Sequence, residues 1–258
     1  MFWGSGILKF ARPIRWITIV IDDKALDGQV FNLKISDCSR GHRILGKDQI
    51  VISSADRYPQ LLEENKVIVD RALRKKIIIE QIQKIARNEK CRPLKAESLV
   101  EEVVDLVEWP KAMMGSFDKK FLSMPKEIII ATMQDHQRYF PVENTEGQLI
   151  NKFIFIANNS SGNDDLIVKG NEKVLRPRLE DANFFYKEDS QTSIESRVSA
   201  LKSTTYHNKL GSVYDKAIRV KKCAENFCAD FGASEEIISE TVVLSYNDLP
   251  SRTVNEFP

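Results

Sequence analysis

The sequence predicts an α+β protein with a mixed first part and a helical second part, and three observations carry this prediction. Residues 16–21 form a continuous apolar run rich in β-branched side chains, which is typical of a strand buried on both faces. Ile78, Ile82 and Ile85 recur at i, i+4 and i+7, which is the spacing of one helix face. After Leu166 strand patterns stop and only helical spacing continues.

The first strand is expected to end at Asp22 and Asp23, and a second should follow where Phe31, Leu33 and Ile35 alternate with other residues. Between them, Asp27-Gly28 is a turn signal that favours a hairpin-like connection.

Two helices and one further strand should complete the mixed part. The isoleucine spacing predicts a helix over about 69–87. Valines at positions 100, 103, 104 and 107 predict a second, which should end at Trp109-Pro110. Residues 152–157 predict a strand, and the polar residues 158–163 after it predict a loop.

The last part reads as a series of helices. One is marked by Ile194, Val198 and Leu201. Another covers 213–227 and could be capped by Ser212. After a break at 231–234, a last helix should turn Ile237, Ile238 and Val242 inward. We therefore expect one mixed domain over residues 1–190 and a helical segment over 191–258.

The composition is typical of a folded chain, which we expect to be cytoplasmic. It gives no overall excess of positive charge from which nucleic-acid binding could be argued. Lys and Arg number 38 against 37 Asp and Glu, so the formal net charge is only +1 and any RNA contact must come from local patches. The 4 cysteines are scattered without CxxC spacing, which favours free thiols in a reducing cytosol. No apolar run reaches the length of a membrane span, and no secretory signal is visible.

The usual signatures of catalysis are missing. No Walker-type or GxGxxG glycine loop is present, so the sequence offers no recognisable cradle for ATP. Asp135-His136 reverses the His-Asp order of metal-dependent phosphohydrolases, and His42 and His207 lie far from it in sequence. We expect no catalytic residue, no metal and no cofactor bound by this chain.

The most informative run is 169–186. Arg176 and Arg178 flank Pro177, so a helix should either start near the proline or kink around it. Their guanidinium groups suit phosphate oxygens, which makes both arginines candidates for binding RNA. The alternative is ordinary core packing, because Leu179, Ala182, Phe185 and Tyr186 recur at helical spacing.

This run resembles a segment of the beta subunit of the bacterial heterotetrameric glycyl-tRNA synthetase. Further matches to the same family, in the same order, are 10–16, 40–43, 107–110, 122–142, 207–212 and 255–258. The resemblance implies an internal fragment, because the family's subunit continues beyond both ends. Residues 246–250 depart from the family, which tends to have a Lys-Ala-Asp-Leu-like stretch there, and Pro250 would disturb a helix.

The resemblance also implies a fold and a division of labour. Residues 1–190 are similar to the B3/B4-like domain of phenylalanyl-tRNA synthetase beta subunits, and 191–258 to the start of an incomplete, HD-like helical domain. In the family, the alpha subunit activates glycine with ATP and Mg²⁺, and the beta subunit contributes recognition of tRNA(Gly). The expected partners are therefore an alpha subunit and tRNA(Gly), and this chain alone should not charge tRNA.

Two further segments are candidates for RNA contact. His136, Arg138 and Tyr139, with their neighbouring glutamines, could stack on unpaired bases or hold phosphates. The alternative is that Tyr139 enters a strand and His136 caps the preceding helix.

The second segment is the run Arg40-Gly41-His42-Arg43, in which Gly41 permits close backbone approach and Arg40, His42 and Arg43 could contact phosphate. A solvated loop is the alternative. Residues 71–76 are a weaker basic candidate, since acidic side chains at 101, 102, 105 and 108 could pair with them.

The alternative to non-catalytic tRNA binding is a hydrolytic function. B3/B4-like domains of the phenylalanine enzyme edit mischarged tRNA, and here Asp135, His136 and Gln137 could position a water. Glycine is the smallest amino acid, so larger ones can be excluded sterically at activation and the need for editing is modest.

Overall fold

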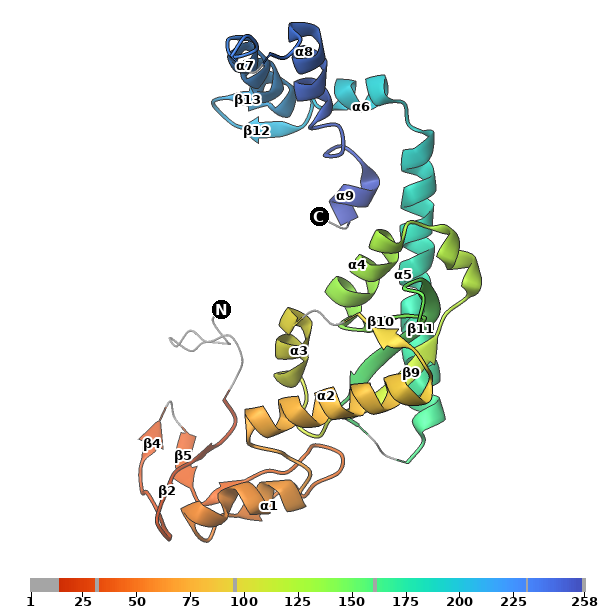
Figure 1. The fold of residues 1–258 in the computed structure, drawn as a ribbon. Helices are drawn as coiled ribbons and strands as arrows, with labels where there is room; N and C mark the ends of the chain where they lie inside the picture. The colour runs from red at the N-terminus through yellow and green to blue at the C-terminus, as the bar shows by residue number, and fades with distance from the viewer. Residues whose placement is uncertain (1–13, 31–32, 95–96, 160–161, 231, 257–258) are drawn as a thin grey trace. The chain divides into compact units, whose positions relative to one another are not determined.

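The computed structural model describes residues 14–30, 33–94, 97–159, 162–230 and 232–256. The chain divides into two compact units, Met1–Ser116 with Arg138–Glu172 and Phe117–Gln137 with Lys173–Pro258, which we describe separately (Figure 1). Helices and strands both contribute, which confirms the α+β class.

The first unit begins with short strands. They are β1 (Ile17–Thr18), β2 (Val20–Ile21), β3 (Lys24–Ala25), β4 (Gln29–Val30), β5 (Leu33–Ser36), β6 (Cys38–Ser39) and β7 (Ile50–Val51). β5 lies between β1, to which it runs parallel, and β4, to which it is antiparallel; β2 pairs with β3 and β6 with β7.

The prediction of one strand buried on both faces over 16–21 is wrong. The run is split into β1 and β2, and Trp16 and Ile21 are 42% and 60% exposed. The hairpin turn lies at Asp22, whose φ is +52°, rather than at Asp27-Gly28. The predicted second strand is found as β5, while Phe31 lies outside the described residues.

Next come a 3₁₀ turn, three helices and the strands of a larger sheet. These are η1 (Ala55–Arg57), α1 (Tyr58–Glu64), α2 (Arg71–Asn88), β8 (Arg92–Pro93), α3 (Glu97–Val104), β9 (Lys111–Ser116), β10 (Phe140–Glu143) and β11 (Leu149–Ala157). The predicted helix over about 69–87 is confirmed as α2, which begins where the Asp70 carboxylate accepts hydrogen bonds from the backbone N–H groups of Ala72 and Leu73. α3 ends at Val104, earlier than expected, and Val107 is buried beyond it.

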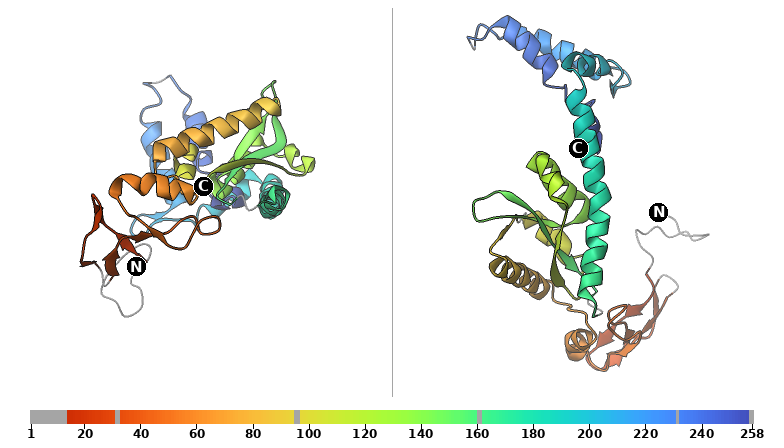
Figure 2. Two further views of the ribbon diagram at one scale, coloured as in Figure 1. Left: turned by 90° about the horizontal axis from the view of Figure 1, so that it is seen from below. Right: turned by 90° about the vertical axis from the view of Figure 1, so that its right-hand side faces the viewer.

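The core of the first unit lies between two helices and an antiparallel sheet of order β8-β10-β11-β9. α2 packs against β9 and α3, and Figures 1 and 2 show it running alongside the sheet. The buried cluster joins side chains from α2, α3, the segment just after α3, β10 and β11, namely Ile78, Ile82, Leu99, Val100, Val103, Val104, Val107, Phe140, Val142 and Ile154. The predicted strand at 152–157 is confirmed as part of β11.

The second unit is mainly helical. Its elements are η2 (Lys119–Ser123), α4 (Lys126–Gln137), most of α5 (Asp164–Gln191), α6 (Ile194–Ala200), β12 (Thr205–His207), β13 (Gly211–Ser212), α7 (Val213–Glu225), α8 (Glu235–Leu244) and α9 (Arg252–Glu256). α5 contains Pro177 in its interior, so the helix does not start there as one alternative supposed. Because Pro177 is exposed, the Lys173 carbonyl that it leaves without a donor can bond water.

The three helices predicted after residue 190 are confirmed as α6, α7 and α8, and two details of this segment are corrected. α7 begins with a capping box between Ser212 and Asp215, as the serine suggested. The segment is not all helical, because β12 and β13 form a hairpin. Ile237 does not face inward, since its side chain is 66% exposed. The expected domain boundary at 190/191 stays a prediction; it lies at the end of α5, whereas the two compact units meet at 116/117, 137/138 and 172/173. The likeness to B3/B4 and HD domains also stays a prediction.

Candidate nucleic-acid interface

Both interpretations of the 169–186 run apply, to different faces of α5. Leu175, Leu179 and Ala182, spaced at i, i+4 and i+7, are fully buried, so this stripe of α5 serves core packing. Arg176 and Arg178 are exposed. Successive helix residues are separated by about 100°, so the two arginines lie on opposite sides of the buried stripe. They therefore cannot clamp one phosphate together.

Arg176 shares its face with two lysines that sequence inspection had not singled out. Lys173 precedes it by three residues and Lys187 follows by eleven, close to whole turns, and both are exposed. We call Lys173, Arg176 and Lys187 the α5 basic face. Among the described residues none of the three forms an ion pair, although Glu180 lies one turn beyond Arg176. Helical spacing applied to the cations alone would have revealed this row.

Tyr139 lies in the core rather than on a surface. Its ring stacks on Phe153 with centroids 4.8 Å apart, it is 6% exposed, and its hydroxyl donates to Asn171 Oδ1 at 2.7 Å. Burial raises the pKa of Tyr139 to about 12. Tyr139 directly precedes β10, which favours the alternative that it enters a strand.

Its neighbours have other environments. Arg138, with a φ of +59°, donates from Nε to Glu102 Oε1 at 2.5 Å. His136 is exposed in the last turn of α4, where a basic side chain is favoured by the helix dipole.

The 40–43 segment is a compact, internally bonded loop. His42 is 3% exposed, and its Nδ1 accepts hydrogen bonds from the backbone N–H groups of Ile44 and Leu45. The Asn65 carbonyl accepts a hydrogen bond from the His42 backbone N–H and lies against Gly46, where any side chain would clash with it. Arg40 and Arg43 are exposed. His42 therefore shapes the loop, and only the two arginines face solvent.

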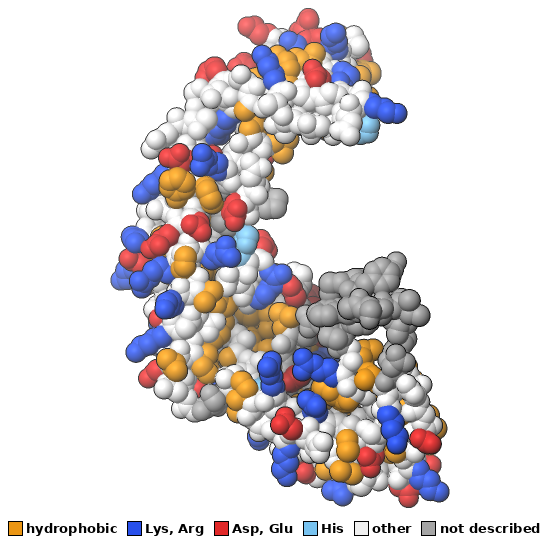
Figure 3. Space-filling model, turned by 180° about the vertical axis from the view of Figure 1, so that it is seen from behind, with side chains coloured by type: hydrophobic (Ala, Val, Ile, Leu, Met, Phe, Trp, Pro, Cys, Tyr) orange, Lys and Arg blue, Asp and Glu red, His pale blue; other side chains and the backbone are white. Residues whose placement is uncertain are grey.

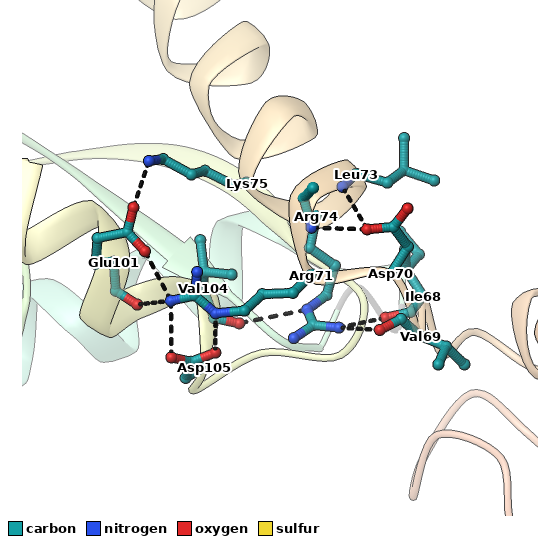
Figure 4. Close-up of polar contacts among 11 residues, drawn as sticks. Ile68, Val69, Asp70, Arg71, Leu73, Arg74, Lys75, Glu101, Val104 and Asp105 are labelled. Carbon is teal, nitrogen blue, oxygen red and sulfur yellow. Dashed lines mark hydrogen bonds and ion pairs between the residues drawn. The ribbon is translucent and has the colours of Figure 1, made fainter.

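The basic side chains at the start of α2 are occupied by acidic partners, as the weaker candidate allowed. Arg71 makes a two-pronged contact with Asp105, from Nε to Oδ1 at 2.8 Å and from Nη2 to Oδ2 at 2.9 Å (Figure 4). Arg71 also pairs with Glu101 at 2.7 Å, and Lys75 pairs with the same carboxylate. Hydrogen bonds from these cations lower the pKa values of Asp105 and Glu101. Arg71 and Lys75 therefore pair with carboxylates of α3 and the residue just after it, and these ion pairs join α2 to α3.

The candidates are divided between the two units. The first contains Arg40, His42, Arg43, Arg138 and Tyr139, and the second contains His136, Arg176 and Arg178. On the face shown in Figure 3, basic side chains are interspersed with acidic ones. Within the described part of the chain, no group of three or more His, Cys, Asp or Glu could hold a metal ion. None of the described helices combines the length and apolarity needed to cross a membrane.

Comparison with known proteins gives the class first. A family model described as glycyl-tRNA synthetase beta subunit matches residues 1–258. The match places the chain in the class of aminoacyl-tRNA synthetase subunits. The chain belongs to the family of glycyl-tRNA synthetase beta subunits.

Named relatives agree along the whole chain. It is 39% identical over 259 residues to the glycine–tRNA ligase beta subunit of Psychromonas ingrahamii. Identity is 38% over 262 residues to that of Listeria monocytogenes and 38% over 265 residues to that of Thermodesulfovibrio yellowstonii. Each match covers 100% of this chain and 38% of the relative, so the chain spans well under half the length of these proteins.

Proposed function

We propose that this chain supplies RNA-binding surface to a glycine–tRNA ligase and carries no part of its catalytic centre. The observation that carries the proposal is the α5 basic face, three exposed cations on one helix of a chain from a tRNA ligase family. In the proposed assembly, a cytoplasmic alpha subunit uses ATP and Mg²⁺ to activate glycine, and the present chain helps to hold tRNA(Gly).

The chemistry of the α5 basic face suits a phosphate backbone. Arg176 offers a planar fork of donors that matches phosphate oxygens, and the lysines offer compact positive charges. Eleven residues of helix separate Arg176 from Lys187, a distance of roughly 16 Å at the rise of an α-helix. The face can therefore contact phosphates at separate points along one RNA backbone. Ion pairing elsewhere, as at Arg71, leaves fewer cations free for such contacts.

The test is a binding titration of the purified chain with tRNA(Gly) and an unrelated tRNA at several salt concentrations. Each phosphate contact releases counterions, so affinity should fall as salt rises. The double substitution Lys173→Ala with Arg176→Ala should weaken binding and reduce the salt slope by about one to two units.

A matched control removes the same charge from other exposed positions of the second unit. Lys119 and Lys222 are exposed and form no ion pair with described residues, so Lys119→Ala with Lys222→Ala should leave affinity and slope nearly unchanged. If both double variants lost tRNA affinity equally, the effect would come from net charge alone, and this site would be refuted. Folded variants with unchanged affinity would also refute it.

The hydrolytic alternative finds no support in the geometry. Positioning a water for deacylation needs an enclosed group of side chains, whereas Asp135 and His136 are exposed at the end of α4. We therefore propose RNA binding alone.

A further inference from the structure

A small pocket lies among the short strands of the first unit. Its volume is about 350 Å³, and it is lined by Trp16, Thr18, Val20, Ser39, Ile52, Ala55 and Tyr58. The residues come from β1, β2, β6, η1 and the start of α1, with Trp16 just before β1 and Ile52 just after β7. None of the described lining side chains is acidic or basic. The pocket is large enough for one small organic group, at the lower end of the usual range for ligand sites.

The exposure of Trp16 needs an explanation. An indole is large and apolar, and this one is 42% exposed beside the pocket. The Arg40 guanidinium lies 4.9 Å from the centre of the ring, against one face. Because the same ring lines the pocket, a planar ligand there can stack on it, and Arg40 places a positive charge nearby.

The hydroxyl groups of the pocket add a polar edge. The Thr18 hydroxyl donates its proton to the Cys38 carbonyl, so its oxygen is left as an acceptor. Ser39 lines the pocket, and its hydroxyl forms no hydrogen bond with any described residue. The pocket thus offers one acceptor and one group able to donate or accept.

We propose that this pocket binds a single unpaired nucleobase, which stacks on Trp16 and directs its polar edge to Ser39 and Thr18, while Arg40 contacts the attached phosphate. Stacking on an aromatic ring with a nearby arginine is a general way to hold a single-stranded base. The residues known to line the pocket, all of them in the described part of the chain, include no carboxylate, which fits an anionic nucleotide. This inference rests on the proposed function, because it names an unpaired nucleotide as the form of RNA that the first unit recognises.

The experiment follows tryptophan fluorescence of the full 258-residue chain during titration with adenosine monophosphate and, separately, with a five-nucleotide single-stranded RNA. Stacking on Trp16 should quench part of the emission in a saturable way. Ala55→Leu should fill the pocket from an exposed position, and it should weaken binding at least tenfold. Gln60→Leu adds the same side chain at an exposed position of α1 that does not line the pocket, and it should leave affinity unchanged.

Further results test the proposal and distinguish a free nucleotide from a base within an RNA strand. Trp16→Leu should abolish the saturable quenching, and far-ultraviolet circular dichroism checks that each variant is folded. Quenching by both ligands that Ala55→Leu weakens would show that a nucleotide alone suffices. Quenching by the RNA only, with the same sensitivity, would assign the site to a base within a strand. No saturable binding, or equal affinity for wild type and Ala55→Leu, would overturn the proposal. Salt-dependent tRNA binding through Lys173 and Arg176 is measured independently, so the two proposals can fail separately.

Discussion

Asp189 in the last turn of α5 anchors Thr253, 64 residues later in the chain. Its carboxylate accepts hydrogen bonds from the backbone N–H groups of Thr253 at 2.7 Å and Arg252 at 3.0 Å, and from the Thr253 hydroxyl. These N–H groups are the first two of α9, so Asp189 acts as a cap supplied from another helix. Arg197 donates to the Asp189 carbonyl and joins α6 to the same point.

Replacing Asp189 should release α9. We expect Asp189→Ala to lower the free energy of unfolding by about 1 kcal/mol, the usual cost of losing a helix cap. Amide hydrogen exchange should show faster exchange at 252–256. Asp181→Ala is the control, because Asp181 is exposed on the same helix and forms no ion pair with described residues. Unchanged exchange in Asp189→Ala would show that α9 is held by other contacts.

The Asp189 carboxylate should make the free energy of unfolding depend on pH in the acidic range. Burial raises the pKa of Asp189, but hydrogen bonds from Thr253 and Arg252 outweigh it, so the net shift is downward. A lowered pKa in the folded state means that the contribution is present above the unfolded value near 3.9 and is lost as pH falls through the folded value. The stability difference between wild type and Asp189→Ala, measured by urea unfolding, should be constant above about pH 5 and shrink toward pH 3. A difference that grows on acidification would contradict this sign.

Two glycines should respond oppositely to alanine. A Cβ at Gly46 would lie 2.4 Å from the Asn65 carbonyl oxygen and 2.6 Å from the His42 nitrogen, both backbone atoms. Gly46→Ala should therefore destabilise the chain by about 2 kcal/mol. Gly170, inside α5, has no atom within 4 Å of such a Cβ, and Gly170→Ala should stabilise it by about 0.5–1 kcal/mol. Thermal unfolding of both variants tests the pair.

The Arg71–Asp105 contact should couple α2 to α3 in a salt-dependent manner. Both side chains are about half exposed, so the coupling should be small and should weaken at high salt. A double-mutant cycle with Arg71→Ala and Asp105→Ala, measured by urea unfolding at two salt concentrations, gives the value. Since these cations are already paired, Arg71→Ala should change tRNA affinity less than Arg176→Ala does. The reverse order would relocate the interface to α2.

Tyr139 should matter for stability and not for RNA. Tyr139→Phe removes the hydrogen bond to Asn171 and should cost about 1 kcal/mol in the free energy of unfolding. The ring stays packed on Phe153, so tRNA affinity of the folded variant should equal that of wild type. A loss of affinity in a fully folded Tyr139→Phe chain would restore this residue as an RNA contact.

Local patterns predicted those elements whose boundaries depend on neighbours in sequence. The α2 helix followed from isoleucines on one face and α7 from an apolar stripe after a serine cap, because helical hydrogen bonds and caps span only a few residues. The strand prediction at 16–21 failed because the same apolar run suits a buried strand or an exposed edge, and only its partners distinguish the two. The row formed by Lys173, Arg176 and Lys187 was visible in principle, since helical spacing alone defines it.

Motifs and periodicity are properties of short stretches of chain, so they were enough to predict the family, the α+β class and the main spans of α2, α7 and β11. The burial of Tyr139, the pairing of Arg71 and the position of Trp16 beside a pocket emerge only in the folded chain. Burial and pairing depend on residues brought together from distant positions, as Asp189 and Thr253 are, and no local pattern specifies which of them meet.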